Sequence, residues 1–188
     1  MNLFFEASII LIMEKLEEKT LSSEIIYEGR IFTVTRDIAK LSNGAERQRD
    51  VVHHNGGVVI LAEKGTKILM VRQFRYPTQE ALYELPAGKL DKNGEDKIAA
   101  AKRELLEETG HIAENWENMG FIYPSPGFCD EKLYLYKASN LTFDKQQPDE
   151  NEIIDFFEIE LEEVFEMIKN GGIKDAKTIC ALMKAYKL

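Results

Sequence analysis

Three glutamates are spaced so that a helix would place their side chains on one face. Glu104, Glu107 and Glu108 occupy positions i, i+3 and i+4, which are neighbours on a helical surface. Their like charges repel, so either solvent or a cation must offset the repulsion. A hard divalent cation takes oxygen ligands, and Mg²⁺ is commonly held by one or two carboxylates plus the phosphates of a substrate. The spacing therefore allows two interpretations, a solvated acidic face or a metal site that handles phosphates.

The residues around these glutamates predict a helix of about four turns, from Gly94 to Thr109. On a helical wheel, four apolar residues fall on the side opposite to the carboxylates and are expected to be buried: Ile98, Ala99, Leu105 and Leu106. A helix anchored in this way would present its carboxylates along one edge.

The wider context resembles the Nudix box, in which glycine, five residues, glutamate and seven residues precede REUxEExGU, where U is bulky and apolar. Here Glu95 is followed by seven residues and then by RELLEETG, residues 103–110, which matches every fixed position. Two departures occur. Six residues rather than five separate Gly88 from Glu95, which indicates a one-residue insertion in the loop 91–94, and His111 occupies the final apolar position. The insertion changes the loop but leaves the helix register intact.

The resemblance implies a role for each residue of the box. It gives as metal ligands the carboxylates of Glu104 and Glu108 and the carbonyl of Ala87. Glu107 is implied to contribute to catalysis by orienting water or supporting the metal. Arg103 and Glu95 are implied to fix the loop on the helix. The implied cofactor is Mg²⁺, with Mn²⁺ able to substitute.

From about residue 18 onward the chain resembles bacterial ADP-ribose pyrophosphatases. Four segments carry this likeness: VRQFRY at 71–76, ELPAG at 84–88, YPSPGF at 123–128 and DAKT at 175–178. Members that cleave ADP-ribose tend to carry a proline about sixteen residues past the box, and Pro126 lies sixteen residues after Gly110. The SQPWPFPQ array of NADH-cleaving members is absent. The resemblance implies Mg²⁺-dependent hydrolysis of the pyrophosphate bond of ADP-ribose to AMP and ribose 5-phosphate.

Five residues are expected to contact the substrate: Arg49, Arg75, Pro126, Phe128 and Glu131. Arg75 is expected to pair with a diphosphate oxygen because the guanidinium fork matches phosphate geometry; a surface salt bridge is the alternative. Arg49 is similar to a position that reaches the adenine end, across a dimer interface; a solubilising charge on a strand is the alternative. Phe128 and Glu131 flank a Pro-Gly loop and are expected to contact the terminal ribose, Glu131 by accepting hydrogen bonds.

A second acidic cluster, Asp149-Glu150-Asn151-Glu152, lies in a polar loop. Taken alone, such a loop is typical of solvated surface. In ADP-ribose pyrophosphatases a similar loop supplies a glutamate base and a further metal ligand. On that likeness Glu150 is expected to be the catalytic base and Glu152 a metal ligand, and the reverse assignment stays open.

Apolar runs and turn residues predict the elements that must position these side chains. Runs at 24–28, 31–36 and 47–53, separated by Gly29-Arg30 and Asn43-Gly44, predict an antiparallel sheet. Continuous apolar runs at 58–62 and 68–71 favour strands buried on both faces. Further strands are predicted at 133–136 and 153–159, and further helices at 161–169 and 175–187. The predicted fold is α/β, a Nudix-type α-β-α sandwich with a mixed sheet, plus a small N-terminal antiparallel sheet.

Three segments follow from this organisation. Residues 1–12 are expected to be an extension, with a packed helix or strand as the alternative. Residues 13–56 contain the N-terminal strands, which resemble the small sheet that pairs two subunits in this family. Residues 57–188 are expected to form the Nudix catalytic domain. A homodimer is therefore expected.

Composition excludes several classes of function. The formal net charge of −9 and the scattered Lys and Arg residues argue against a nucleic-acid-binding surface. The apolar run at 1–13 is too short to span a bilayer and is interrupted by Glu6. Cys129 and Cys180 form no disulfide or zinc pattern, which favours a reducing compartment and hence the cytoplasm.

The expected partner is thus a small nucleotide-sugar substrate, and two rival functions stay open. One is hydrolysis of another nucleoside diphosphate sugar, such as an ADP-sugar or GDP-mannose. The other is a non-catalytic sensor that binds ADP-ribose. The sensor would tolerate loss of the metal carboxylates, which are all present in this chain.

Overall fold

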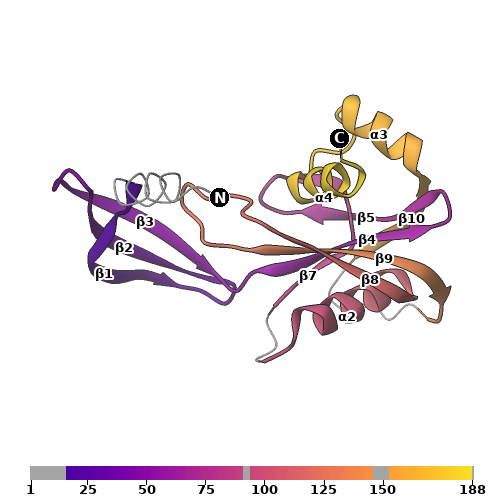
Figure 1. Ribbon diagram of the computed structural model, residues 1–188, viewed down its shortest axis with the longest axis horizontal. Helices are drawn as coiled ribbons and strands as arrows, with labels where there is room; N and C mark the ends of the chain where they lie inside the picture. The colour runs from indigo at the N-terminus through magenta and orange to yellow at the C-terminus, as the bar shows by residue number, and fades with distance from the viewer. Residues whose placement is uncertain (1–15, 91–93, 146–152, 188) are drawn as a thin grey trace, which may run out of the picture. The chain divides into compact units, whose positions relative to one another are not determined.

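The computed structural model describes residues 16–90, 94–145 and 153–187 (Figure 1). Residues 1–12 and the loop that carries Glu150 and Glu152 lie outside the described residues. The chain divides into two compact units. The N-terminal unit comprises Met1–His54 and Ser125–Glu131, and the sandwich unit comprises Asn55–Pro124 and Lys132–Leu188.

The N-terminal unit is built on an antiparallel sheet in the order β1-β2-β3. Its strands are β1 (Lys19–Glu28), β2 (Phe32–Lys40) and β3 (Glu46–His54). All three predicted runs lie in strands that are longer than predicted, although β2 begins at Phe32, one residue later than predicted. The β2–β3 turn contains Gly44 with φ of 84°, in the left-handed region that glycine adopts at no steric cost. Every residue of β1 is exposed, so this sheet carries apolar side chains that the unit itself does not cover.

The sandwich unit contains a seven-stranded sheet in the order β10-β5-β4-β9-β8, with β6 paired to β5 and β7 paired to β4. Its strands are β4 (Gly57–Lys64), β5 (Lys67–Arg75), β6 (Glu80–Glu84), β7 (Ala87–Lys89), β8 (His111–Ile122), β9 (Leu133–Phe143) and β10 (Ile154–Glu160). The β4–β9 pair is parallel. The other pairs are antiparallel, so the sheet is mixed as predicted.

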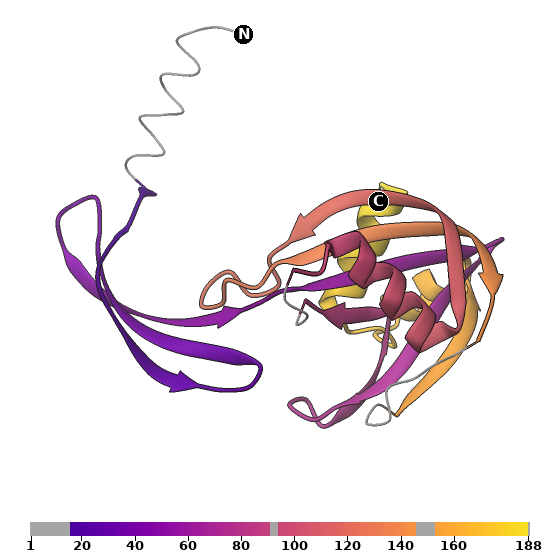
Figure 2. The ribbon, with the colours of Figure 1, turned by 90° about the horizontal axis from the view of Figure 1, so that it is seen from below.

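Helices cover both faces of this sheet. Helix α2 (Lys97–Thr109) lies on one face, and α3 (Leu161–Lys169) and α4 (Ala176–Tyr186) lie on the other (Figures 1 and 2). Strand β4 explains the arrangement, because successive side chains of a strand point to opposite faces. Val59 and Leu61 pack in one core cluster with residues of α3 and α4. Ile60, between them in sequence, packs in the other cluster with α2.

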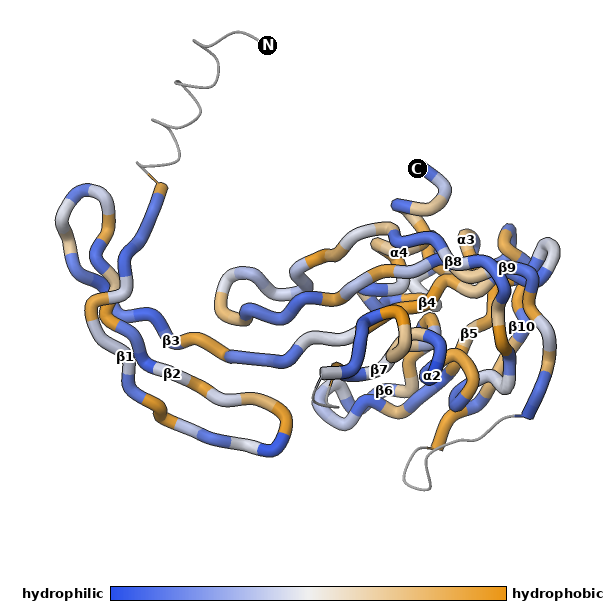
Figure 3. The backbone as a smooth tube through the Cα atoms, turned by 60° about the horizontal axis from the view of Figure 1, so that its bottom comes forward, coloured by the Kyte–Doolittle hydropathy of each residue, from blue (hydrophilic) through white to orange (hydrophobic). Residues whose placement is uncertain are grey.

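The apolar character of β4 follows from this double burial, and Figure 3 shows apolar residues along the strand. The predicted α-β-α sandwich with a mixed sheet and a small N-terminal antiparallel sheet is confirmed. Among the described residues, no helix has the length and apolar content needed to cross a membrane.

Helix α2 begins later than predicted and buries a different face. The Asp96 side chain accepts a hydrogen bond from the Ile98 N–H and caps the helix. Gly110, with φ of 70°, ends it in the left-handed conformation typical of helix ends. Ala100, Ala101 and Leu105 are buried, together with Glu104 and Glu108. The prediction that Ala99 is buried was wrong, since Ala99 is exposed. The carboxylates therefore border the buried face instead of lying opposite to it.

Strand β8 is the largest element that the sequence pattern did not predict. It pairs with β9 at one edge of the sheet. Its middle, AENWEN at 113–118, is rich in Glu and Asn, which are depleted in strands. The strand forms because β9 offers pairing partners along its length, interrupted by a register shift between Asn118 and Phe121, and its polar side chains are tolerated at an edge.

Candidate metal and diphosphate site

Strand β7 brings the box backbone against helix α2. The backbone N–H of Ala87 donates to Glu108 Oε2 at 3.0 Å. A Cβ atom added to Gly88 would lie 1.9 Å from Glu104 Cδ and 2.0 Å from its Oε1. Both carboxylates therefore pack against the same two backbone residues. Three of the predicted metal-binding residues, Ala87, Glu104 and Glu108, are thus brought together.

Burial makes these two carboxylates unusual. Glu104 is 9% exposed and Glu108 is 6% exposed, whereas glutamates are almost never fully buried unless paired. Removing a charge from water is costly unless another charge or hydrogen bonds compensate. Two carboxylates held side by side at a buried edge are therefore a place where a bound cation would be stabilised.

Arg103 supplies part of the compensation. Its Nε and Nη2 donate to the two oxygens of Glu95 at 3.1 and 3.2 Å. Its Nη1 donates to Glu104 Oε1 at 2.6 Å and to Glu107 Oε2 at 2.7 Å. Burial opposes the charge of Arg103, but these contacts, led by the hydrogen bond to Glu95, outweigh it and raise the pKa of Arg103. The structure thus shows the loop-to-helix link expected for Arg103 and Glu95.

Within residues 16–90, 94–145 and 153–187, no three or more His, Cys, Asp or Glu side chains are gathered as a preformed metal cage. What is present is a pair of buried carboxylates beside the Ala87-Gly88 backbone. Mg²⁺ is usually bound by one or two carboxylates plus substrate phosphates, and rarely by an all-protein cage. The residues therefore fit a Mg²⁺ ion that binds together with its substrate.

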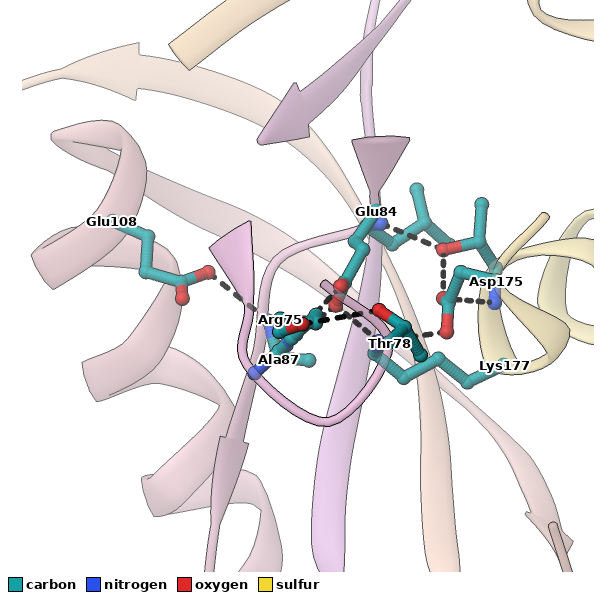
Figure 4. Close-up of polar contacts among 9 residues, drawn as sticks. Arg75, Thr78, Glu84, Ala87, Glu108, Asp175 and Lys177 are labelled. Carbon is teal, nitrogen blue, oxygen red and sulfur yellow. Dashed lines mark hydrogen bonds and ion pairs between the residues drawn. The ribbon is translucent and has the colours of Figure 1, made fainter. Parts of the chain in front are cut away.

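Arg75, at the end of β5, lies near this carboxylate pair. Its Nε and Nη2 donate to the two oxygens of Glu84 at 2.6 and 2.5 Å. The hydrogen bond to Glu84 is the main cause of a raised pKa of Arg75, and the charge of Glu108 also contributes. Figure 4 shows Arg75 and Glu84 between Glu108 of α2 and the first turn of α4. Arg75 is thus paired, as the salt-bridge alternative proposed, and it lies on the side of Glu84 that faces Glu108 in Figure 4.

Glu84 is a site residue to which sequence reasoning gave no role. It is 1% exposed and pairs with both Arg75 and Lys177. Burial alone would raise the pKa of Glu84, but the hydrogen bonds and charges of Arg75 and Lys177 outweigh burial and hold it below its ordinary value. A carboxylate in the otherwise apolar run ALYELPA, 81–87, is the signal that could have indicated a buried, paired acid.

His111 occupies the final position of the box, where a bulky apolar residue is expected. It is 2% exposed, and its ring packs against Phe143 and Phe156. Its Nδ1 lies 2.8 Å from the Thr109 carbonyl. The ring therefore provides apolar contact while a backbone group satisfies its buried nitrogen.

The N-terminal unit contains the other residues expected to bind substrate. Arg49 donates from Nε and Nη2 to the carboxylate of Glu18 at 2.9 and 2.8 Å, and both side chains are exposed. Exposed pairs of this kind contribute little stability. The pairing with Glu18 would therefore not prevent Arg49 from contacting another anionic group. Pro126 and Phe128 are exposed on the loop 125–131.

Strand β3 fixes this loop. Val52 N–H donates to the Phe128 carbonyl at 2.8 Å, and Asp130 N–H donates to the Val52 carbonyl at 3.1 Å. The Asp130 carboxylate lies 2.7 Å from His53 Nδ1. Glu131 is held 3.3 Å from His54 Nδ1. The exposed Phe128 ring and the Glu131 carboxylate are therefore presented from an anchored backbone.

Comparison with known proteins gives two family matches. A NUDIX domain model matches residues 52–182, and a model of the nucleoside diphosphate sugar hydrolase N-terminal domain matches residues 18–52. The boundary between these two matches falls within β3 (Glu46–His54).

Curated relatives match most of the chain. An ADP-ribose pyrophosphatase of Bacillus subtilis is 38% identical over 90% of this chain and 93% of its own. A methanol dehydrogenase activator of Bacillus methanolicus is 41% identical over 88% and 91%. A GDP-mannose pyrophosphatase of Pectobacterium atrosepticum is 33% identical over 79% and 82%.

The fold has a solved counterpart. A crystal structure of an ADP compounds hydrolase superposes with a TM-score of 0.82 and 23% sequence identity, covering 92% of this chain and 94% of that chain. At this level of identity the likeness shows the fold alone.

Proposed function

Because the chain belongs to the NUDIX domain family, we propose that it hydrolyses the pyrophosphate bond of ADP-ribose, with Mg²⁺ as cofactor, to AMP and ribose 5-phosphate. The observation that carries this proposal is the packing of Glu104 and Glu108 against Ala87-Gly88. An acidic protein of net charge −9 repels an anionic substrate. A cation bound at these carboxylates would offset this repulsion and allow a diphosphate to bind.

Each site residue has a defined part in this mechanism. Glu104, Glu108 and the Ala87 carbonyl would hold the cation, which when bound neutralises the diphosphate and lowers the pKa of water. Arg75 would donate to a diphosphate oxygen and hold the diphosphate in place beside the cation. Glu107 would orient the attacking water, and Glu150 would accept its proton.

The substrate class is supported by the relatives. Enzymes named for ADP-ribose and for GDP-mannose hydrolysis both match, the first with the higher identity. ADP-ribose is therefore the proposed substrate, and another nucleoside diphosphate sugar is the alternative. Arg49, Pro126, Phe128 and Glu131 are proposed to contact the nucleoside and ribose ends of the substrate.

A substrate panel tests the proposal. The purified protein is incubated with ADP-ribose, ADP-glucose, GDP-mannose, NADH and diadenosine polyphosphates in the presence of Mg²⁺, and products are separated by chromatography. We expect ADP-ribose to be turned over fastest, with AMP and ribose 5-phosphate in equal amounts. EDTA should abolish turnover and Mn²⁺ should restore it. Faster turnover of GDP-mannose would establish the alternative, and binding of ADP-ribose without turnover would establish a sensor.

The similarity to a methanol dehydrogenase activator favours a second candidate function, activation of a dehydrogenase. Its test is the rate of methanol oxidation by a methanol dehydrogenase with and without this protein. A Glu108→Gln variant separates two modes of action. Loss of activation in that variant would tie the effect to hydrolysis, whereas retained activation would indicate binding alone.

The acidic loop at 149–152 gives a prediction that the described residues do not test. We expect Glu150→Gln to lower kcat by about 10²-fold at every Mg²⁺ concentration, the lower end of the usual contribution of a general base. Glu152→Gln should instead raise the Mg²⁺ requirement and recover at high Mg²⁺. Steady-state kinetics across a Mg²⁺ series distinguish the two. Exchanged phenotypes would exchange the roles, and normal turnover by both variants would leave Glu107 as the candidate base.

We also propose that the N-terminal sheet pairs two subunits. Several large apolar side chains of β1, β2 and their connection are 39–63% exposed: Leu21, Ile25, Ile26, Tyr27, Ile31 and Phe32. Large apolar side chains left exposed on one small sheet are a feature of interaction sites. The N-terminal match to nucleoside diphosphate sugar hydrolases covers the same strands.

Light scattering tests this assembly. We expect a mass about twice 21.6 kDa at micromolar concentration, and the protein should stay dimeric after deletion of residues 1–12. Ile25→Asp should yield monomers, because an apolar interface does not accept a buried unpaired charge. Glu24→Gln on the same strand is the control and should stay dimeric. A wild-type monomer at every concentration would remove the cross-subunit role of Arg49.

The proposed location is the cytoplasm. Cys129 and Cys180 are both free, and disulfides are rare in reducing compartments. Fractionation of cells that express the protein from its own gene would check the proposal, with the protein expected among the cytoplasmic enzymes.

A further inference from the structure

Two cations from distant parts of the chain converge on one buried carboxylate. Arg75, at the end of β5, and Lys177, in the first turn of α4, both pair with Glu84. The Glu84 side chain is 1% exposed and the Lys177 side chain is 13% exposed. A carboxylate so deeply buried and held by charged donors has little freedom to move. Glu84 therefore holds the charged ends of Arg75 and Lys177 in fixed positions.

Helix α4 is itself fixed at this point. Asp175 Oδ2 accepts hydrogen bonds from the backbone N–H of Thr178 at 3.0 Å and from its hydroxyl at 2.6 Å. The Thr178 hydroxyl accepts a hydrogen bond from the Leu85 N–H at 2.8 Å. Asp175 Oδ1 lies 3.0 Å from Lys177 Nζ. The first turn of α4 is thus bound to the backbone next to Glu84, and Lys177 is held in place by its own helix (Figure 4).

The pairing leaves one edge of Arg75 available. Nε and Nη2 are occupied by Glu84, and among the described residues no hydrogen bond involves Nη1. The Arg75 side chain is 39% exposed. Figure 4 shows Arg75 between Glu108 of α2 and the first turn of α4, so a ligand bound at Glu108 would lie on the side of this guanidinium. A guanidinium with one edge fixed and one edge free is prepared to donate to a diphosphate oxygen.

We infer that Glu84 and Lys177 are positioning residues that orient Arg75 toward the substrate diphosphate and keep its positive charge effective. This inference rests on the proposed function. Paired with Glu84 alone, Arg75 would be largely neutralised. Lys177 offsets the charge of Glu84, and the charge of Asp175 lies at the N-terminus of α4, where the helix end stabilises it. The charge of Glu84 is therefore shared between two cations instead of being matched by Arg75 alone.

Steady-state kinetics of Lys177→Met test the inference. An arginine that binds the diphosphate equally in ground and transition state contributes to KM and little to kcat. We expect KM for the substrate to rise about tenfold, since a charge-assisted hydrogen bond is weakened, with kcat changed less than about threefold. Lys177→Arg should recover most of the loss. Lys177→Gln, which keeps the polar donor without the charge, replaces the methionine variant if the latter does not fold.

Lys174 provides a matched control. It precedes α4 by two residues and pairs with Glu80 of β6 at 2.7 Å, but both side chains are at least half exposed. Lys174→Met should therefore leave KM and kcat unchanged. An equal rise in KM for both variants would overturn the inference, because it would reflect general loosening of this region.

A double-mutant cycle separates positioning from an independent effect. If Lys177 acts through Arg75, then Lys177→Met should raise KM in the wild-type background and should add no more than about twofold in the Arg75→Ala background. Effects that multiply would overturn the inference, since Lys177 would then act without Arg75.

Nuclear magnetic resonance gives a readout that does not depend on turnover. The side-chain Nε–H signal of Arg75, assigned with an Arg75→Lys variant, reports the bond to Glu84. We expect this signal to shift in Lys177→Met and to remain in place in Lys174→Met; an unchanged signal in Lys177→Met would overturn the inference. If the wild-type protein hydrolyses no nucleotide sugar, the proposed function fails, while the shift still decides whether Lys177 positions Arg75.

Discussion

Replacement of Glu108 by glutamine is expected to lower kcat for the nucleotide-sugar substrate by about 10³-fold while the fold stays intact. Glu108 is 6% exposed and accepts a hydrogen bond from Ala87 N–H. A glutamine oxygen can still accept that bond, so the packing of β7 on α2 is preserved. What is lost is the negative charge that would bind the cation, and a cation at the diphosphate stabilises the transition state by several kcal/mol. A loss of about 4 kcal/mol corresponds to about 10³-fold in rate.

The measurement is kcat at saturating Mg²⁺ together with thermal unfolding followed by circular dichroism. Glu163→Gln is the control, because Glu163 is an exposed acid in the first turn of α3 and loses the same charge away from the site. The control should retain wild-type kinetics. Near wild-type turnover by Glu108→Gln would remove α2 from the mechanism, and a large drop in melting temperature would show that Glu108 serves the fold.

The box helix was predictable because its signals are local. Helical periodicity and the seven-residue spacing after Glu95 are properties of a short stretch, and α2 forms there. A helical wheel shows which residues share a face, but it does not show which face the rest of the protein covers. Ala99 was therefore assigned to the core wrongly, while the predicted Leu105 is buried together with Ala100 and Ala101. The same limit hid the burial of the glutamate pair, which depends on where β7 lies.

The anchor of Arg75 lay beyond sequence reasoning for a different reason. Glu84 and Lys177 are 93 residues apart in the chain, and their meeting depends on the pairing of β6 with β5 and on the docking of α4. Neither is encoded in a local pattern. The ELPAG and DAKT segments drew attention only through family resemblance. Of the two alternative roles of Arg75, the structure shows the salt bridge, made to Glu84 by Nε and Nη2, and the role as a diphosphate ligand stays a proposal.

Gly88→Ala is expected to lower kcat by about 10³-fold with little loss of stability, an effect equal to loss of a metal ligand. Gly88 does not adopt the left-handed conformation, so its backbone accepts alanine without strain. The added methyl group would lie 1.9 Å from Glu104 Cδ, and the carboxylate must move away. The colliding atoms, Cδ, Oε1 and Cγ, all belong to the Glu104 side chain and none to the backbone. The side chain can therefore turn away, and we expect Tm to fall by no more than about 4 °C, which corresponds to about 1 kcal/mol.

Two comparisons test this account of the box glycine. Gly172→Ala is the control, because its added Cβ would lie no closer than 3.4 Å to its nearest neighbour, the Met167 carbonyl oxygen, and its kinetics should match the wild type. Glu104→Gln should lose kcat to a similar extent as Gly88→Ala. If the glycine matters only because it leaves room for the Glu104 carboxylate, the double variant Gly88→Ala/Glu104→Gln should be hardly slower than either single variant. If the losses in kcat of the two single variants multiply in the double variant, Gly88 serves the reaction through its own backbone. A Gly88→Ala variant with wild-type kcat would show that Glu104 binds no essential metal.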